Sequence, residues 1–164
     1  MTQIQVYNTG SNAAKAQLLR EKLALAGVFI YQRLDSTNAQ AMRDLAAGEA
    51  CPFLVLARQQ TAGKGRRGRV WESPAGAGLY YSLALELKAE NRNLAALSLV
   101  TALSVHAALT ELGVTNLNLK WPNDVLNCGR KLSGILLESM FRGGSQFLVI
   151  GIGVNLNLPA AIKT

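Results

Sequence analysis

Aromatic residues, cysteine and histidine are scarce in this chain of 164 residues, and each scarcity excludes a class of function. Aromatic residues make up 6% of the chain, so it lacks the stacking platforms that single-strand nucleic-acid binders use. Cys51 and Cys128 match no metal-binding spacing and indicate two free thiols. His106, the one histidine, falls inside a predicted helix, and no Ser/His/Asp or Cys/His arrangement forms around it.

Long hydrophobic runs and targeting signals are also lacking. Residues 94–112 are largely apolar but include Ser98, Thr101, Ser104 and His106, which is too polar for a bilayer span. The first residues have neither a charged n-region nor an apolar h-region, so we expect no secretory signal. We therefore expect a cytoplasmic protein with no membrane partner.

Basic residues outnumber acidic residues, 17 to 10, which gives a net charge of +7 and a pI near 9.8. This balance favours an anionic partner, such as a nucleotide, a nucleic acid, an anionic lipid or an acidic protein. The chain is 49% hydrophobic, enough for one core, and we find no internal repeat. We expect a single domain over residues 1–164.

The basic residues concentrate in a glycine-rich loop at residues 58–71. This loop holds five Lys and Arg residues, no acid, and three glycines, Gly63, Gly65 and Gly68. Glycine lets a backbone turn through positive φ and approach a ligand closely. Guanidinium groups and free amides together suit phosphate oxygens. We interpret the loop as a binding site for a phosphate ester.

The sequence of this loop allows two other interpretations. Residues 63–68 satisfy the dinucleotide fingerprint G-x-G-x-x-G, but that motif needs a helix to open inside it. Pro74 follows six residues later with no helical periodicity between, which argues against such a site. A solvated basic loop that contacts nucleic acid, or nothing, is equally supported by this stretch alone.

Periodicity and turn residues predict the order of elements. Helices are expected at 12–26, capped by Asn12 and ended by Gly27, at 39–47, and at 93–112. Strands are expected at 28–34, 51–57, 79–87, 116–121, 125–126, 132–140 and 147–158. Hairpin turns are expected at 127–130 and 142–145. Residues 35–38 are all capping or turn formers, so a plain helix N-cap is one interpretation of them.

Five short motifs follow one another over residues 35–155. They are Asp-Ser-Thr-Asn at 35–38, Gln-Thr-Ala-Gly-Lys-Gly-Arg-Arg-Gly-Arg-Val-Trp at 60–71, Lys-Trp-Pro-Asn-Asp at 120–124, Gly-Arg-Lys-Leu-Ser-Gly at 129–134 and Gly-Ile-Gly-Val-Asn at 151–155. One of these alone is weak evidence, whereas five in order are specific. Together they resemble the catalytic domain of biotin protein ligases. The resemblance implies an α/β fold of the α+β type, with a mixed, largely antiparallel sheet flanked by helices, like class II aminoacyl-tRNA synthetases.

The resemblance also implies a reaction and its partners. Biotin and ATP, with Mg²⁺, would form biotinyl-5′-AMP, and the biotinyl group would pass to a lysine of a biotin carboxyl carrier protein domain. The residues support this independently at one point, because the chain offers cations, glycines and amides but no obvious nucleophile. Adenylation needs none from the protein, since the ligand carboxylate attacks the α-phosphate and the protein positions and neutralises charge.

The site residues implied by the resemblance fall into four groups. Lys131, Arg66 and Lys120 are expected to be catalytic. The biotin-binding group comprises Ser36, Thr37, Asn38, Gln60, Lys64, Gly65, Arg66, Lys131 and Gly134. The nucleotide-binding group comprises Gly63, Arg66, Arg69, Trp71, Asn123, Asp124 and Asn155, and Asp124 is also the expected Mg²⁺ ligand. On local grounds alone, Trp71 would be a core residue, Asn155 a strand-end hydrogen-bond former and Asp124 a turn residue.

The chain also departs from the family pattern. Lys64 stands where arginine is common, which keeps the charge but loses the planar fork. We expect neither an N-terminal helix-turn-helix nor a C-terminal β-barrel domain, and hence no DNA partner; a homodimer is left open. The alternatives are a lipoate or octanoate ligase or transferase of the same fold, a truncated biotin-binding protein with little turnover, and a basic nucleic-acid-binding module.

Overall fold

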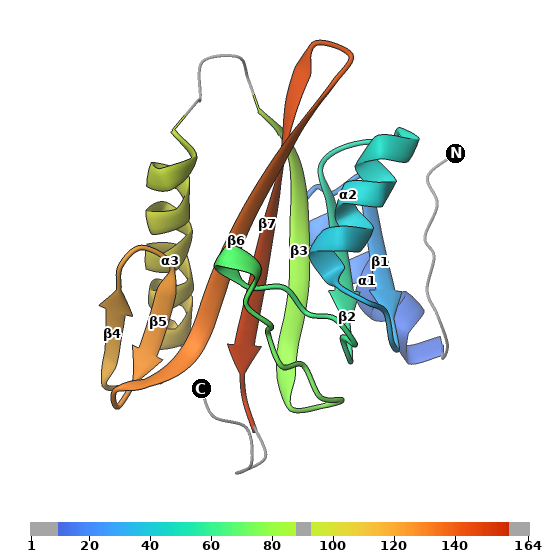
Figure 1. Ribbon diagram of the computed structural model, residues 1–164. Coiled ribbons are helices and arrows are strands. Elements are labelled where there is room, and N and C mark those ends of the chain that lie inside the picture. The colour runs from blue at the N-terminus through green and yellow to red at the C-terminus, as the bar shows by residue number, and fades with distance from the viewer. Residues whose placement is uncertain (1–9, 88–92, 158–164) are drawn as a thin grey trace.

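A single seven-stranded sheet organises the computed structural model, which describes residues 10–87 and 93–157 (Figure 1). From one edge to the other, the strands are β1 (Gly27–Tyr31), β2 (Phe53–Ala57), β3 (Gly78–Leu87), β7 (Ser145–Asn155), β6 (Arg130–Arg142), β5 (Asp124–Asn127) and β4 (Leu117–Lys120). The α-helices of the described part are α1 (Gly10–Lys22), α2 (Thr37–Ala47) and α3 (Leu94–Glu111).

The sheet is mixed and largely antiparallel, which confirms the expected fold class. β1 and β2 pair in parallel, and every other neighbouring pair is antiparallel. Parallel neighbours need a crossover connection, and α2 supplies it between β1 and β2. The turn between β5 and β6 has positive φ at both Cys128 and Gly129, as a two-residue hairpin requires, so this predicted hairpin is confirmed.

Helices cover both faces of the sheet and leave part of one face open. α2 packs on one face, where Phe29, Phe53 and Val149 contact Ala41 and Leu45 of the helix in a buried cluster. α1 and α3 pack on the opposite face in two further clusters. In Figure 1, α2 and residues 60–71 lie in front of the sheet, and α1 and α3 lie behind it. Beside α2, no helix of the described part covers the front face of β7 and β6.

The first helix ends earlier than the sequence predicts, so the expected bounds of 12–26 are wrong. α1 begins at Gly10, ahead of Asn12, and ends at Lys22. Ala24 adopts a left-handed conformation with φ 51°, and the Leu25 N–H donates to the carbonyl of Arg20 at 3.0 Å. This is a Schellman ending built on alanine, where glycine is usual. It turns Leu25 into the core, and Gly27 begins β1.

The other predicted elements are present with shifted ends. The strand predicted at 28–34 stops at Tyr31, and the helix predicted at 39–47 begins two residues earlier, at Thr37. The last strand ends at Asn155 rather than 158, and Leu158 lies outside the described residues. Among the described residues, no helix has both the length and the apolar character needed to cross a membrane.

Candidate functional site

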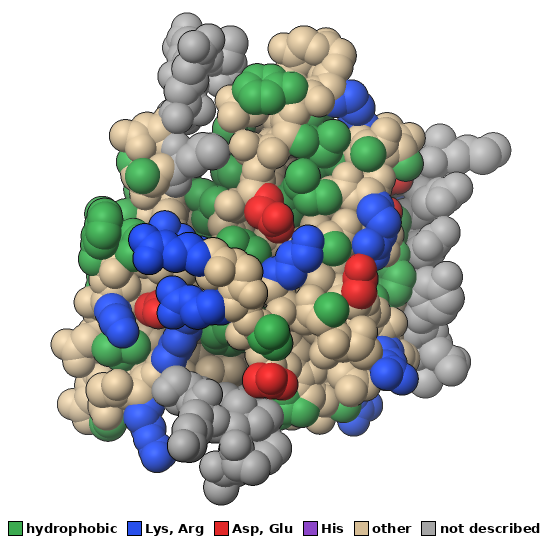
Figure 2. All heavy atoms as spheres, viewed as in Figure 1, with side chains coloured by type: hydrophobic (Ala, Val, Ile, Leu, Met, Phe, Trp, Pro, Cys, Tyr) green, Lys and Arg blue, Asp and Glu red, His purple; other side chains and the backbone are tan. Residues whose placement is uncertain are grey.

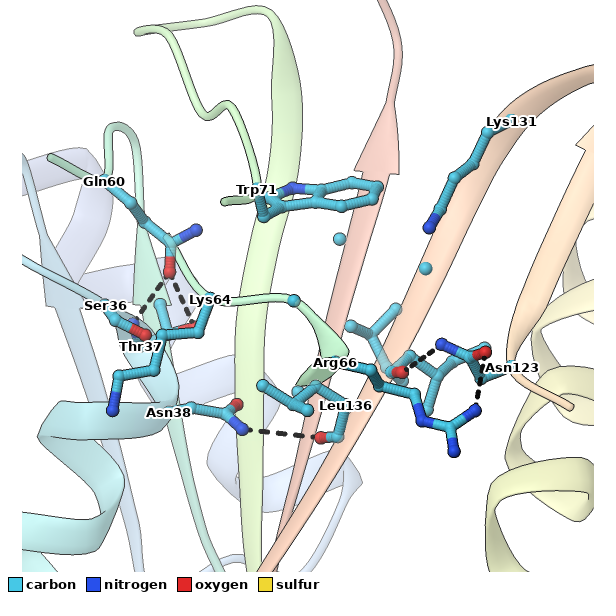
Figure 3. Close-up of a pocket in the computed structure, with 16 residues that line it drawn as sticks. Ser36, Thr37, Asn38, Gln60, Lys64, Arg66, Trp71, Asn123, Lys131 and Leu136 are labelled. Atoms are coloured by element: carbon cyan, nitrogen blue, oxygen red, sulfur yellow. Dashed lines mark hydrogen bonds between the residues drawn. The ribbon is translucent and has the colours of Figure 1, made fainter. Parts of the chain in front are cut away.

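A pocket lies on the open front face of the sheet, and each of the five sequence motifs contributes to its lining. It encloses about 430 Å³ of space, part of it continuous with solvent. Three lining residues are cations and none is acidic. The lining consists of Ser36, Thr37, Asn38, Gln60, Lys64, Gly65, Arg66, Trp71, Asn123, Lys131, Gly134, Ile135, Leu136, Gly151, Ile152 and Gly153. Figure 3 shows these residues converging from α2, residues 60–71, β6 and β7.

The start of α2 forms the polar end of the pocket. Ser36 is the N-cap, with its hydroxyl oxygen 3.4 Å from the Ala39 N–H, so the N-cap interpretation of residues 35–38 is confirmed. The same turn buries Ser36, Thr37 and Asn38 against the sheet, although all three are polar. Buried polar groups are retained where hydrogen bonds satisfy them. This short segment therefore both starts a helix and lines the pocket.

Gln60 closes the polar end from the side of the glycine-rich loop. Its Oε1 accepts from the backbone N–H of Thr37 at 2.8 Å and lies 3.1 Å from the Thr37 hydroxyl (Figure 3). Its Nε2 donates to Ser73 Oγ at 2.7 Å, and Ser73 is buried. Because both ends of the amide have partners, Gln60 is held in one orientation, with its oxygen toward α2.

The floor of the pocket is made of glycines because neighbouring side chains lie directly on the strands. A Cβ atom at Gly153 would stand 2.6 Å from Nε1 of Trp71, and one at Gly134 would stand 2.8 Å from Cζ3 of the same ring. A Cβ at Gly151 would collide with the side chain of Asn38. Glycines inside strands allow this close approach. They seat Trp71 and Asn38 flat against β7 and β6.

Lys131 stands beside the indole ring at the other end of the pocket. Its Nζ lies 5.1 Å from the centroid of Trp71, within cation–π range, and 2.9 Å from Oδ1 of Asp124. Trp71 Nε1 is covered and donates to no residue of the described chain, so a ligand that moved this ring would break no hydrogen bond of the indole with those residues. The ammonium group is held in place, yet it remains on the pocket wall (Figure 3).

The glycine-rich loop folds back on itself over the pocket. The Trp71 N–H donates to the carbonyl of Gly63 at 2.9 Å, and the Gly65 N–H donates to that of Arg69 at 2.7 Å. Between these contacts, Arg66–Gly68 form a 3₁₀ turn, and Nη1 of Arg66 donates to Asn123 Oδ1 at 3.2 Å. The loop contains no helix of the dinucleotide-binding kind, which agrees with the rejection of that fingerprint.

Positive charge gathers on this face of the molecule. Figure 2 shows several Lys and Arg side chains close together on the left half of the view, over the region of the glycine-rich loop and β4 to β6. Arg66, Arg67, Arg69, Lys120 and Arg130 are all exposed. An anion that approached this face would meet an attractive field, as the composition led us to expect.

Five predicted site residues lie outside the pocket lining. They are Gly63, Arg69, Lys120, Asp124 and Asn155. Gly63 anchors the loop, Asp124 pairs with Lys131, and Asn155 Nδ2 donates to the Lys131 carbonyl at 3.1 Å. Arg69 and Lys120 are exposed, and Lys120 is one strand further from the pocket, opposite Asp124. Asn155 thus makes the strand-end hydrogen bond that local reasoning suggested.

Sequence reasoning missed three polar side chains that support the pocket from behind. Ser73 bonds Gln60, Ser82 contacts both Thr37 and Asn38, and Glu138 accepts from Asn38. Ser82 carries a usable signal, because it is a small polar residue at an inward position of a largely apolar strand and is fully buried. Ser73 and Glu138 carry none in the sequence.

Two titratable groups outside the pocket, Asp35 and Cys51, have pKa values that their surroundings shift. The Arg43 guanidinium beside Asp35 lowers the pKa of that carboxyl to about 2, and the two side chains lie 2.8 Å apart. Burial raises the pKa of the Cys51 thiol to about 11, which makes it unreactive. Cys51 and Cys128 are both free, as predicted. The described residues contain no group of three His, Cys, Asp or Glu arranged to hold a metal ion.

Comparison with known proteins connects this geometry to one family. Residues 30–155 match the Biotin/lipoate A/B protein ligase family. A biotin-(acetyl-CoA-carboxylase) ligase of Paracoccus denitrificans is 50% identical over 129 residues, which cover 76% of this chain and 52% of that protein.

Two solved structures share the fold. The biotin protein ligase from Aquifex aeolicus, in complex with biotin and ATP, matches with a TM-score of 0.68 and 38% identity over 82% of this chain and 56% of that one. The Leishmania major ligase, in complex with biotinyl-5-AMP, gives a TM-score of 0.69 and 28% identity over 82% of this chain and 59% of that one.

The chain therefore spans between half and three-fifths of the length of these relatives. The part that matches contains the whole pocket, because each lining residue falls between Ser36 and Gly153. The resemblance that the five motifs carried is confirmed at the level of the family. The chain belongs to the Biotin/lipoate A/B protein ligase family, and its matched segment, residues 30–155, holds every residue that lines the pocket.

Proposed function

We propose that this chain activates biotin with ATP to form biotinyl-5′-AMP and transfers the biotinyl group to a lysine of a biotin carboxyl carrier protein domain. The observation that carries the proposal is the polarity of the pocket. Buried hydrogen-bonding groups occupy one end, Lys131 and Arg66 stand toward the other (Figure 3), and all of the lining lies in the family segment. Relatives that match this segment are biotin ligases by name.

The two ends of the pocket suit the two ends of biotin. The ureido ring carries two N–H donors and a carbonyl acceptor, and Ser36, Thr37, Asn38 and Gln60 offer hydroxyl and amide partners. The valerate carboxylate is an anion, and Lys131 and Arg66 offer it charge-assisted hydrogen bonds. The aliphatic part between them would lie against the Trp71 ring, which covers Gly134 and Gly153 of the floor. This orientation directs the carboxylate toward the glycine-rich loop.

The proposed reaction needs positioning and charge rather than a protein nucleophile. A carboxylate oxygen of biotin attacks the α-phosphorus of ATP, the bond to the β-phosphate oxygen breaks, and pyrophosphate leaves with the electron pair. The carrier lysine, as a free amine, then attacks the acyl carbon, and AMP leaves as the amide forms. Lys131 and Arg66 would neutralise charge in the first step, and the lining holds neither cysteine nor histidine. Lys120 and Arg69 are exposed cations outside the lining, and we assign them to the phosphates beyond the α-position.

Mg²⁺ is part of the proposal, with Asp124 as the protein ligand. One carboxylate together with nucleotide oxygens and waters is a usual way to hold this ion. Asp124 is the carboxylate of the Lys120–Asp124 motif, and its Oδ1 is bound to Lys131. The residues present fit an ion that is held mainly by the nucleotide. Such an ion would supply charge neutralisation to the phosphates.

The test is pyrophosphate release by the purified chain in the presence of biotin and ATP, alongside calorimetric titration with biotin and with lipoate. We expect biotin-dependent pyrophosphate release and no heat of binding with lipoate. Binding of biotin without pyrophosphate release would identify a biotin-binding protein with little turnover. Binding of lipoate in place of biotin would identify the other branch of the family and overturn the proposal.

A further inference from the structure

Glu138 is a carboxylate beside the polar end of the pocket, although it does not line the pocket itself. It follows Gly134 and Leu136 at a spacing of two residues along β6, so its side chain projects from the same face of the sheet. Its Oε2 accepts a hydrogen bond from Nδ2 of Asn38 at 2.8 Å. Within the part of the chain that the structure describes, Glu138 forms no salt bridge. Asn38 thus supplies a donor that this half-buried charge requires.

The charge on Glu138 sets which way the Asn38 amide faces. A carboxylate only accepts hydrogen bonds, so Nδ2 must point toward it and Oδ1 must point away. The Leu136 carbonyl, 3.4 Å from Nδ2, imposes the same orientation (Figure 3). A reversed amide would place its oxygen against two acceptors. Asn38 is 3% exposed, so water cannot compensate for the reversed arrangement.

Through Ser82, the orientation of the Asn38 amide determines the direction in which the Thr37 hydroxyl donates. Ser82 Oγ is fully buried, 2.6 Å from Asn38 Oδ1 and 2.8 Å from Thr37 Oγ1. A hydroxyl has a single proton, and an amide oxygen can only accept, so the Ser82 proton lies on the contact to Asn38. The contact between the two hydroxyls then needs the proton of Thr37. Thr37 Oγ1 has one proton and two acceptors in reach, Ser82 Oγ at 2.8 Å and Gln60 Oε1 at 3.1 Å. Donation to the nearer acceptor, Ser82, leaves the lone pairs of Thr37 Oγ1 for other partners.

We propose that Glu138 is a positioning residue that fixes Thr37 Oγ1 and Gln60 Oε1 as hydrogen-bond acceptors toward the ligand head. Gln60 Oε1 already faces Thr37 because its amide nitrogen is held by Ser73. Two acceptors on this wall match a ring that carries N–H donors. The inference rests on the proposed function, since the ureido ring of biotin has two such donors. The dithiolane ring of lipoate has none, so it would leave Thr37 Oγ1 and the second lone pair of Gln60 Oε1 without a donor from the ligand. The hydrogen-bond relay from Glu138 through Asn38 and Ser82 to Thr37 therefore selects biotin.

A single substitution can reverse the directions of these hydrogen bonds while the side chain at residue 138 keeps its size and shape. In Glu138→Gln the side-chain NH₂ can donate to the Asn38 oxygen, so only the long contact to the Leu136 carbonyl, 3.4 Å, still favours the original orientation of the Asn38 amide. When that amide flips, Ser82 can donate to Thr37, and Thr37 can donate to Gln60 Oε1, 3.1 Å away. Both lone pairs of Gln60 Oε1 are then occupied within the protein, one by the backbone N–H of Thr37 and one by its hydroxyl. We expect the Kd for biotin, measured by calorimetry, to rise on the order of tenfold, with the Kd for ATP unchanged. Glu138→Asp, which remains a pure acceptor, should keep most of the affinity.

Glu86→Gln is the matched control, because it removes one exposed carboxylate from β3, which β7 separates from β6, without touching the relay. Ser82→Ala cuts the relay between Asn38 and Thr37, so in that background Glu138→Gln should have little further effect on biotin affinity. A merely structural role would give additive losses in this cycle.

Three experimental results would contradict either the positioning role of Glu138 or the proposed function. Biotin affinity within about twofold of wild type in a folded Glu138→Gln chain overturns the positioning role while leaving the proposed function in place. If Glu138→Gln fails to fold, unchanged affinity in Ser82→Ala alone overturns it equally. Wild-type chain that binds no biotin would remove the proposed function, and the relay's role in selecting biotin with it.

Discussion

Lys131 is a residue whose charge matters more than its packing. Its ammonium group lies between the Asp124 carboxylate and the Trp71 ring, at the end of the pocket where the proposed carboxylate and α-phosphate would meet. We predict that Lys131→Ala loses biotin-dependent pyrophosphate release by about 100-fold or more, as is typical when one such electrostatic group is removed. Release is measured with saturating biotin and ATP.

The control for this substitution is Arg130→Ala, which removes an exposed cation from the adjacent position of the same strand. It changes the net charge equally and should leave the rate close to that of wild type. Thermal unfolding of both variants shows whether the fold is kept. A folded Lys131→Ala chain with a near-normal rate would contradict the role given to this lysine.

At the scale of single residues, the sequence indicates ligand-facing groups better than the groups that hold them. Thr37, Gln60 and Trp71 belong to recognisable motifs, and all three line the pocket. Ser82 and Glu138 could not be found in the same way, because they reach Asn38 only through the register of β3, β7 and β6. That register depends on pairing between segments far apart in the chain, and a local pattern does not encode it.

The C-terminus of α1 is an element boundary that local helix propensity does not predict. Residues 23–26 are good helix formers, yet the helix stops because Ala24 turns left-handed and Leu25 enters the core. A left-handed conformation costs an L-residue roughly 1–2 kcal/mol, whereas glycine adopts it freely. We predict that Ala24→Gly raises the free energy of unfolding by about 0.5–1 kcal/mol. Urea denaturation at equilibrium measures it.

Ala14→Gly is the matched control, since it makes the same chemical change at an exposed position inside α1. There glycine should lower the free energy of unfolding by about 0.8–1 kcal/mol. The two substitutions are thus expected to have opposite signs. Destabilisation of similar size by both would show that Ala24 does not hold the left-handed conformation in solution.

The glycine-rich loop is the element whose order should depend on ligand. Nine of the ten residues from Thr61 to Val70 are exposed or half-buried, and few hydrogen bonds hold the central turn, Arg66–Gly68. A phosphate between Arg66 and its neighbours would add contacts that exist only in the closed loop. We predict fast amide hydrogen exchange at residues 66–68 in the free chain and clear protection with a non-hydrolysable biotinyl-adenylate analogue.

Trp71 provides an internal reference, because its N–H already donates to Gly63 at the base of the loop. Its exchange should be slow in both states. Arg66→Ala removes the contact to Asn123 and the main phosphate partner, so it should reduce the ligand-induced protection. Equal protection of residues 66–68 with and without the analogue would show that loop order is not coupled to the ligand.

For the whole molecule, local patterns predict the kinds of elements, while their arrangement comes from non-local pairing. Periodicity and turn residues place each helix and strand of the described part to within a few residues. They do not give the strand order, in which β7, the last strand, lies at the centre between β3 and β6. Several strands have similar apolar patterns, so only packing of the complete chain decides which ones pair. The family resemblance supplied the sheet type that periodicity could not.

Acid stability is a property of the whole molecule that one surface pair should influence. Asp35 lies at the junction of β1 and α2, where Arg43 binds both of its carboxylate oxygens at 2.8 Å. The folded-state pKa of Asp35, about 2, is below its unfolded value of 3.8 because of this hydrogen bonding to Arg43. A carboxyl with a lowered pKa stabilises the fold above its unfolded pKa, and this stabilisation is lost as pH falls through the folded pKa. Both side chains are about half exposed, so solvent screening limits the contribution to less than about 1 kcal/mol.

We therefore predict that Asp35→Asn lowers the free energy of unfolding at pH 6, and that its difference from wild type shrinks as pH falls from about 4 to 2. Urea unfolding of both proteins at fixed ionic strength across this range measures the difference. Glu111→Gln, at the exposed end of α3, controls for the loss of one surface carboxylate and should show a flat difference. The pair would have no role in acid stability if the Asp35→Asn difference stayed constant from pH 6 to pH 2. A difference that grew toward low pH would instead mean that the carboxyl destabilises the fold when it is charged.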